Sequence, residues 1–331
     1  MSSLKKDIVS ACGPFRRILV AVDADGLASN AVLRGALLAR ALDAKVELVH
    51  AVDLASGSWF RRHERELETV RAQAMALARA RTITNLPAVE QGVGARIEDL
   101  LRVVPGPPAQ AILRRIVNSH ADLLVLGAHA KRGLLDFGST ARALLSHSEV
   151  PVWVQAELVR PIARVLAAVD LSEHSRTALA VADALANRLD AELHVVTCFV
   201  PPPFAYAESP DALPVPSYVL EREVEELESD FARWLDDFPW IRARASSVVV
   251  RGDPRSEIPR AAEDEDLVVL GTQGRTGLSR FLLGSIAYGV LRRTTMPVLV
   301  VPDPGRAWLL DAPEPAGAGA RRASELLPGR R

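Results

Sequence analysis

Two glycine-rich stretches have the residue types and the spacing of a phosphate-binding loop. In the second half of the chain, Gly271 and Gly274 directly follow the apolar run 266–270 and precede Gly284 and Ser285. Glycine lets a backbone approach a phosphate closely, and the free N–H groups at a helix start attract anions. This spacing predicts a phosphate site that is built from backbone groups rather than from charged side chains.

The first half carries a weaker copy of the same loop, with Gly127, Gly138 and Ser139 in place. Ala130 stands where the second glycine would be, and the loop is shorter by two residues. We therefore expect the ligand site in the second half, and a mainly structural role for the first half.

Other chemistries find less support in the sequence. The chain has no lysine after Lys131, so the second half lacks a P-loop lysine, and no G-x-G-x-x-G follows its first strand. The seven histidines have no metal-ligand spacing. Ser285 is interpreted as a helix cap or phosphate donor rather than a nucleophile, and Cys198 as a core residue rather than a reactive thiol. Asp170 has two readings, a ligand contact or a capping or turn residue.

The elements that would position these residues repeat at an offset of about 147 residues. Each half begins with an apolar strand that ends in aspartate, 18–23 and 165–170, and alternates strands with helical patterns thereafter. Alternation of this kind predicts an α/β protein of two tandem open parallel-sheet three-layer sandwiches, with five strands and about four helices each. The predicted helices include 31–42, 177–189, and two exposed amphipathic ones at 59–81 and 218–237. The predicted domains are an N-terminal extension 1–14, domain 1 at 15–157, domain 2 at 158–302, and a disordered tail 303–331.

Composition narrows the class of protein further. The formal net charge of the 331 residues is −1. The chain therefore lacks the excess of basic residues that nucleic-acid binding requires. Cys12 and Cys198 are too few for a disulfide framework or a zinc cluster. No apolar run approaches the roughly 18 residues of a membrane span, and no signal sequence is recognisable. We expect a cytoplasmic protein without a nucleic-acid partner and without a membrane span.

Three features together resemble the universal stress protein family. They are the first strand ending in aspartate, the G-x2-G-x9-G-S loop from Gly271 to Ser285, and the closing strand 297–301. The doubled chain is most similar to the tandem, UspE-like type. The resemblance implies the adenine nucleotide alpha hydrolase-like fold, a stress-response role, and ATP as ligand, with Mg²⁺ carried by the phosphates.

The resemblance also assigns site residues in domain 2. Ala168 and Asp170 would contact adenosine, and Cys198 would offer backbone atoms to adenine. The ribose and phosphates would be surrounded by Gly271, Gly274, Gly284, Ser285, Ile286 and Ala287. The closing strands 151–154 and 297–301 would pair the two halves as an intramolecular pseudo-dimer, and a homodimer of chains is a further expectation.

Three functions stay open at this point. The first is a nucleotide-sensing module with ATP in domain 2. The second is a binding protein for another ligand, a lipid or a phosphorylated metabolite, with the cleft widened by the proline-rich loop 201–216. The third is a slow ATPase in which Arg275 and Arg280 would clamp charge but could not act as a base. No catalytic residue is predicted.

Overall fold

The computed structural model describes residues 15–24, 28–53, 64–85, 96–127, 138–201, 216–242, 244–272 and 283–302. The predicted terminal extension and tail lie outside these described residues, as do Gly274, Ala130, Arg275 and Arg280.

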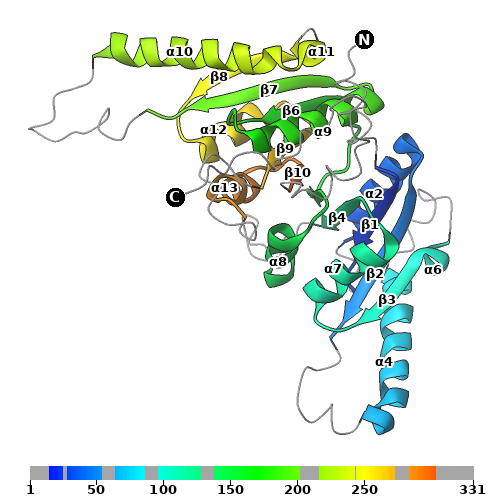
Figure 1. Cartoon of the computed structure of the whole chain (residues 1–331). Coiled ribbons are helices and arrows are strands. Elements are labelled where there is room, and N and C mark those ends of the chain that lie inside the picture. Colours follow the sequence, from blue (N-terminus) through cyan, green and yellow to red (C-terminus); the bar gives the residue numbers. More distant parts are fainter. Residues whose placement is uncertain are drawn as a thin grey trace, which may run out of the picture.

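The two halves have matching elements (Figure 1). The first half contains β1 (Arg17–Ala21), α2 (Ser29–Leu42), β2 (Lys45–Val52), α4 (Glu64–Asn85), α6 (Ile97–Leu100), β3 (Leu101–Pro105), α7 (Pro108–Ser119), β4 (Leu123–Gly127), α8 (Ser139–His147) and β5 (Val152–Gln155). The second half contains β6 (Arg164–Ala168), α9 (Glu173–Leu189), β7 (Glu192–Phe199), α10 (Ser217–Asp236), α11 (Pro239–Arg242), β8 (Ser246–Arg251), α12 (Pro254–Ala261), β9 (Leu267–Gly271), α13 (Ser285–Arg293) and β10 (Val298–Val301).

The ten strands of the described residues form one sheet in the order β3-β2-β1-β4-β5-β10-β9-β6-β7-β8. Neighbours are parallel within each half, and the chain order reverses between β1 and β4 and again between β6 and β9. The one antiparallel pair joins β5 to β10, with Trp153 opposite Leu299. The predicted α/β fold class is therefore confirmed, and the two closing strands do pair.

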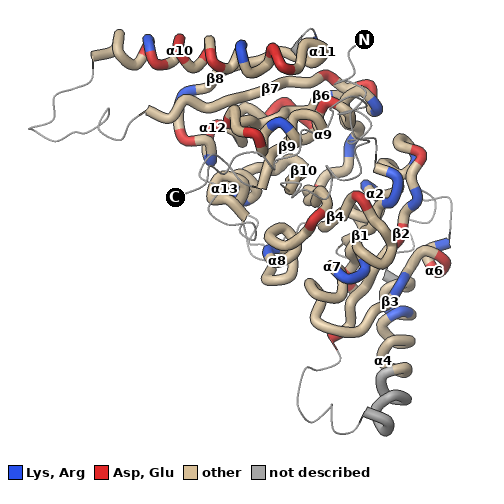
Figure 2. Tube along the Cα trace, viewed as in Figure 1, with Lys and Arg blue, Asp and Glu red and all other residues tan. Residues whose placement is uncertain are grey.

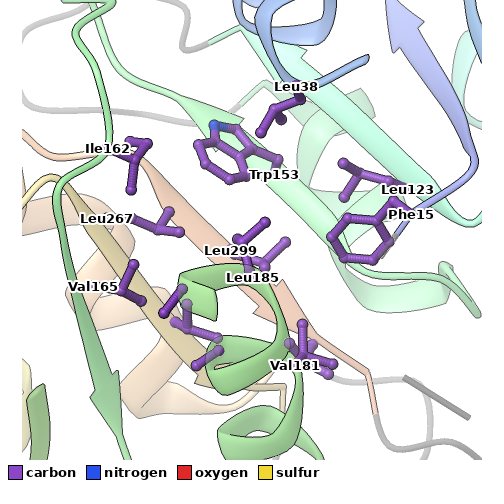
Figure 3. Packing of buried hydrophobic residues seen from close by; sticks show 14 of the residues in the cluster. Phe15, Leu38, Leu123, Trp153, Ile162, Val165, Val181, Leu185, Leu267 and Leu299 are labelled. Carbon is purple, nitrogen blue, oxygen red and sulfur yellow. The ribbon is translucent and has the colours of Figure 1, made fainter. Parts of the chain in front are cut away.

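Helices cover both faces of the sheet and enclose two apolar clusters. One cluster runs beneath α2, α9 and α10 and crosses from one half to the other. Figure 3 shows Trp153 and Leu38 facing Leu299 and Leu185 across this junction. The other cluster lies beneath α7, α8, α12 and α13. Fully buried Trp153 therefore belongs to a core that both halves share.

A carboxylate fixes the start of the first strand in each half. Asp122 accepts hydrogen bonds from the backbone N–H groups of Arg16 and Arg17 at 2.8 and 2.9 Å. In the second half, Asp266 accepts from Ala163 and Arg164 in the same manner. The two halves therefore also match at the amino-terminal edge of the sheet, which is opposite the edge that carries the glycine loops.

The two exposed helices agree with their amphipathic patterns. α10 buries Val224, Phe231, Trp234 and Leu235, and acidic and basic residues are spread along the rest of the helix, as Figure 2 shows. α4 matches the predicted helix from Glu64 onwards, and the predicted start at 59–63 lies outside the described residues. No helix in the described part of the chain is long and apolar enough to cross a membrane.

A buried arginine ties α2 to the segment between the halves. The Arg34 side chain is 2% exposed, donates to Gln155 Oε1 at 2.9 Å and to the Arg160 carbonyl at 2.7 Å, and lies over the Trp153 ring. Burial lowers the pKa of Arg34 to about 10, and the negative charge of Asp266 opposes that effect. The guanidinium therefore stays charged near neutral pH, where it orders the connecting segment.

Candidate functional site

The predicted site residues of domain 2 that the structure describes lie at the carboxyl edge of its sheet. β6 ends at Ala168, which pairs with Leu270 of β9 and Val196 of β7. Gly271 ends β9, and Cys198 lies on β7 beyond the last residue of β6. The edge between β6 and β9 is the point where strand order reverses, the usual ligand position in open parallel sheets.

Apolar packing brings several of these residues together on one face. Ala168 and Ala287 are buried in the cluster beneath α12 and α13, and Cys198 packs against it. Gly274 alone among the nine predicted binding residues lies outside the described part.

Asp170 belongs to a turn that starts α9. Its Oδ1 accepts from the Ser172 N–H at 3.1 Å, from the Ser172 hydroxyl at 2.5 Å, and from the Ser175 hydroxyl. Ser172, not Asp170, is the N-cap of α9, and Leu171 between them has a φ of 62°. Of the two structural readings of Asp170, the turn residue is right and the N-cap is wrong. A ligand contact stays a prediction.

The predicted phosphate position at the start of α13 has no side-chain cap. Gly284 is the N-cap, and the first turn contains no acidic residue. Tyr288 N–H donates to the Gly284 carbonyl at 2.9 Å, which is the first bond of the helix. The backbone N–H groups in the first turn of α13, before Tyr288, have no partner within the helix. The helix dipole adds partial positive charge at the same place.

Backbone geometry explains little of the glycine at position 284. Its φ is −58° and its ψ is 149°, values that any residue adopts. Gly284 N–H donates to the Thr272 carbonyl at 2.8 Å, which closes the loop onto the end of β9. Neither the φ nor this hydrogen bond requires glycine. We therefore infer that the benefit of glycine at position 284 is its missing side chain, which lets a ligand approach the start of the helix closely.

Two carboxylates lie near Cys198, a juxtaposition that sequence analysis missed. Burial, together with the charges of Glu257 and Asp253, raises the pKa of the Cys198 thiol to about 12. The thiol is therefore protonated at neutral pH, as expected for a packing residue. The carboxylates come from α12, which follows the Gly252 turn (φ 137°) beyond β8.

Arg255 links α12 to α13 close to this edge. It forms a two-pronged contact with Asp253, with Nε 2.9 Å from Oδ2 and Nη2 2.8 Å from the same oxygen. Its side chain lies over Gly289, where an added Cβ would come within 2.5 Å of Arg255 Cγ. Asp253 also caps α12 through the Arg255 N–H, and its pKa is lowered chiefly by the Arg255 side chain.

The corresponding edge of domain 1 encloses a cavity of about 320 Å³. It lies between the ends of β1, β2 and β4 and the starts of α7 and α8, and Gly127, Gly138 and Ser139 line it. The sequence comparison of the two loops did not reveal this cavity, because its walls come from separate elements.

The two units each have the strand order 3-2-1-4-5, and in each a helix that starts after a glycine lies at the carboxyl edge of the sheet. These features define a tandem α/β protein with a candidate ligand position at the switch point of each half. The family model described as the universal stress protein family matches residues 14–155 and again 161–302. The chain belongs to the universal stress protein family and is of its tandem type. The predicted boundary between domains at 157 and 158 stays a prediction.

Individual relatives agree with this membership. A universal stress protein of Methanocaldococcus jannaschii is 30% identical over 143 residues, which is 43% of this chain and 82% of that protein. One from Mycobacterium tuberculosis is 31% identical over 194 residues, 56% of this chain and 63% of that protein. The match thus spans less than two thirds of the mycobacterial relative.

Solved structures share the fold over most of the chain. A universal stress protein from Archaeoglobus fulgidus superposes with a TM-score of 0.58 at 20% identity, covering 87% of this chain and 98% of that one. Another, solved in complex with cAMP, is 24% identical and covers 44% of this chain and 99% of that one, with a TM-score of 0.29. At 20% identity the first structure supports the fold of this chain and nothing finer. The second, with a TM-score of 0.29, adds nothing to that.

Proposed function

We propose that this chain is a nucleotide-binding stress-response module of the cytoplasm that holds ATP in domain 2, with Mg²⁺ carried by the phosphates. The observation that carries the proposal is the start of α13, where an uncapped helix follows a glycine that needs no special φ. Phosphates are the common ligand of such helix starts, because the free N–H groups and the dipole both favour negative charge.

The surroundings fit the other parts of the nucleotide. Ala168 and Ala287 offer a buried apolar face beside Cys198, and Asp170 lies just beyond the end of β6. In the proposal, adenosine lies over this face with its sugar toward Asp170. The phosphates then extend toward Gly284 and Ser285.

Regulation rather than catalysis is the proposed outcome of binding. The carboxylate of Asp170 already accepts hydrogen bonds from Ser172 and Ser175, which makes it a poor general base. α13, whose start would bind phosphate, contacts domain 1 through Tyr288, whose ring lies 5.6 Å from the Arg142 guanidinium. A ligand bound at the start of α13 would therefore lie close to the contact between the two halves and could change it.

Calorimetric titration of the full chain with ATP tests the proposal, with Gly284→Leu and the matched Gly138→Leu as variants. A side chain at 284 would separate the phosphates from the helix start. Loss of two charge-assisted hydrogen bonds, at about 1.5–3 kcal/mol each, should weaken ATP binding at least a hundredfold. Gly138→Leu should leave ATP affinity within about threefold, because position 138 belongs to the other cleft.

Mass spectrometry of the chain purified without added nucleotide separates this proposal from its main competitor. A copurified lipid or phosphorylated metabolite, with no measurable ATP affinity, would contradict ATP as the ligand. Equal losses from Gly284→Leu and Gly138→Leu would contradict the assignment to domain 2.

A further inference from the structure

The sheet ends in two edge strands, β3 and β8, which lie at opposite ends of the strand order (Figure 1). Along a strand, the N–H and C=O groups of successive residues point alternately toward one neighbour and toward the other side. On β3, the Gly106 N–H donates to the Val52 carbonyl of β2. On β8, the Gly252 N–H donates to the Phe199 carbonyl of β7. Even-numbered residues therefore face the sheet on both edge strands, and odd-numbered residues face outward.

The outward groups of β3 are largely occupied by the chain itself. The Leu101 N–H donates to the Ile97 carbonyl of α6. The Leu101 carbonyl accepts a hydrogen bond from Arg79 Nη1 at 2.6 Å. Pro105, the last outward residue of the strand, has no N–H to donate, and Arg102 adds an exposed charge. Proline and charge are devices that keep edge strands from pairing with other chains.

β8 lacks these devices over most of its length. Its outward residues are Ser247, Val249 and Arg251, and their backbone N–H groups find no hydrogen-bond partner in the described part of the chain. Val248 lies where β3 has Arg102, and it is 52% exposed. The segment 246–250 contains neither a charged residue nor a proline. An edge strand of this kind is open to pairing with a further strand.

The open edge of β8 is complementary to a second copy of itself. With a two-fold axis at Val249, antiparallel pairing places Val249 opposite the same residue of the second copy, and Ser247 opposite Arg251. Each of these opposed pairs would exchange two backbone hydrogen bonds. Val250 packs against the cluster beneath α12 and α13, and Val248 projects from the same face of the sheet. Val250 of the second copy would lie opposite Val248 and cover its exposed surface.

The charges near β8 permit this pairing. The two Arg251 residues would be separated by four strand positions, roughly 14 Å, which exceeds the Debye length of about 8 Å at physiological ionic strength. Arg244, just before the strand, is already paired with the buried Asp183 carboxylate. The chain also uses an antiparallel junction of this type internally, where residues 152–154 of β5 pair with 298–300 of β10.

We propose that β8 is a dimerisation edge, to which a second copy of this chain adds its own β8 in antiparallel orientation. The sheets of the two molecules then become one continuous sheet. The same strand is used on both copies, so the contact closes at two molecules. β3 does not extend the assembly, because Pro105 and the occupied groups of Leu101 leave it too few outward partners. The dimer does not depend on nucleotide binding.

Sedimentation velocity of the full chain without nucleotide, from about 1 to 100 µM, tests this edge. We expect a concentration-dependent species with twice the 35.8 kDa mass of one chain. Ser247→Pro removes an outward donor and leaves the hydrogen bonds to β7 in place. Val248→Lys places a charge opposite Val250 of the second copy. Each variant should raise the dissociation constant of the dimer at least about tenfold.

Val117→Lys is the matched control, because Val117 is also an exposed valine, at 65%, but lies on α7. It should change the dissociation constant less than about twofold. Thermal melting reports whether each variant remains folded.

A cross-link tests the register. In a Cys12→Ser background, Val249→Cys would face the same residue of the second copy, within the Cα separation of about 7 Å that a disulfide allows. Ser246→Cys would be about 20 Å from its counterpart. Mild oxidation should therefore link two chains through Val249→Cys and not through Ser246→Cys.

The proposal is overturned if the unaltered chain stays monomeric over this range, or if assembly continues beyond two copies. It is also overturned if either folded β8 variant dimerises like the unaltered chain, or if Val117→Lys weakens the dimer equally. Cross-linking that is equal for the two cysteine variants would contradict the antiparallel pairing about Val249. Failure of ATP to bind would contradict the proposed function and leave these results unaffected.

Discussion

Cys198 offers a direct measure of the electrostatic environment beside the proposed adenine position. Burial and the charges of Glu257 and Asp253 raise its pKa from 9.0 to about 12. Only the thiolate reacts with alkylating reagents, so this rise lowers the reactive fraction about a thousandfold at pH 8. In a Cys12→Ser variant, where Cys198 is the only cysteine left, we expect iodoacetamide labelling to be slower than that of free glutathione by about that factor.

The two causes of the raised pKa can be separated by substitution. Asp253→Asn keeps an N-cap for α12 while removing its charge, and Glu257→Gln removes the other charge at nearly constant shape. Because burial is the largest of the three causes of a rise of about three pKa units, the two charges together contribute less than two, and the double variant should label less than about a hundredfold faster. Glu257 and Asp253 favour the neutral thiol, so their removal must lower the pKa and never raise it.

Mass spectrometry of the alkylated chain between pH 7 and 10.5 gives both the rate and its pH dependence. The expected rate climbs about tenfold with each pH step of one and does not level off in this range. A plateau above pH 9, or labelling within tenfold of glutathione at pH 8, would refute the reasoning. Recovery of glutathione-like rates in the double variant would show that charge, not burial, dominates.

Three further predictions concern the packing of α2 and of the junction between the two halves. Gly35→Ala should lower the free energy of unfolding by about 1–2 kcal/mol in urea titrations despite better helix propensity, because the new Cβ would lie 2.5 Å from Val20 Cγ2; a gain in stability would contradict this. Trp153→Ala should cost about 3–5 kcal/mol, measured in the same way, because this fully buried ring fills the shared core; a loss below 1 kcal/mol would mean that the halves are stabilised separately. Arg34→Ala should destabilise more than Arg34→Met, because methionine fills the space while both remove the buried charge; the opposite order in thermal melts would show that packing of the Arg34 stem matters little.

The alternation of strands and helices in the two halves could be predicted from the sequence, because it follows from local periodicity repeated twice. The glycine loop stays a prediction, since residues 273–282 lie outside the described part of the chain. The closing strands pair as expected, with Trp153 opposite Leu299. Individual caps are harder to predict. Asp170 and Ser172 are both good capping residues, and the structure has Ser172 as the N-cap, after Leu171 with a φ of 62°.

Contacts between distant segments could not be predicted from the sequence. Glu257 influences Cys198 because β7 and β8 pair with Cys198 opposite Val250, after which the Gly252 turn brings α12 back over the edge. The burial of Arg34 could not be predicted from the sequence, because an arginine in an alanine-rich helix normally lies in solvent. Its partners Gln155 and Arg160 are more than 120 residues away.

The cavity of domain 1 also shows why a degenerate loop does not by itself indicate that the space for a ligand is lost. In domain 1 alanine replaces one loop glycine and the loop is shorter by two residues, but the cavity at the switch point is made by β1, β2, β4 and the helices beyond them. Those elements must remain for β5 to pair with β10 and for the shared core to close. Packing of the tandem fold therefore preserves a cleft in domain 1 whether or not it binds a nucleotide, and its lining is free to change chemistry. The two halves already differ in this way, since His50, Ala109 and Ala111 stand at the positions of Thr197, Arg255 and Glu257 in the second half.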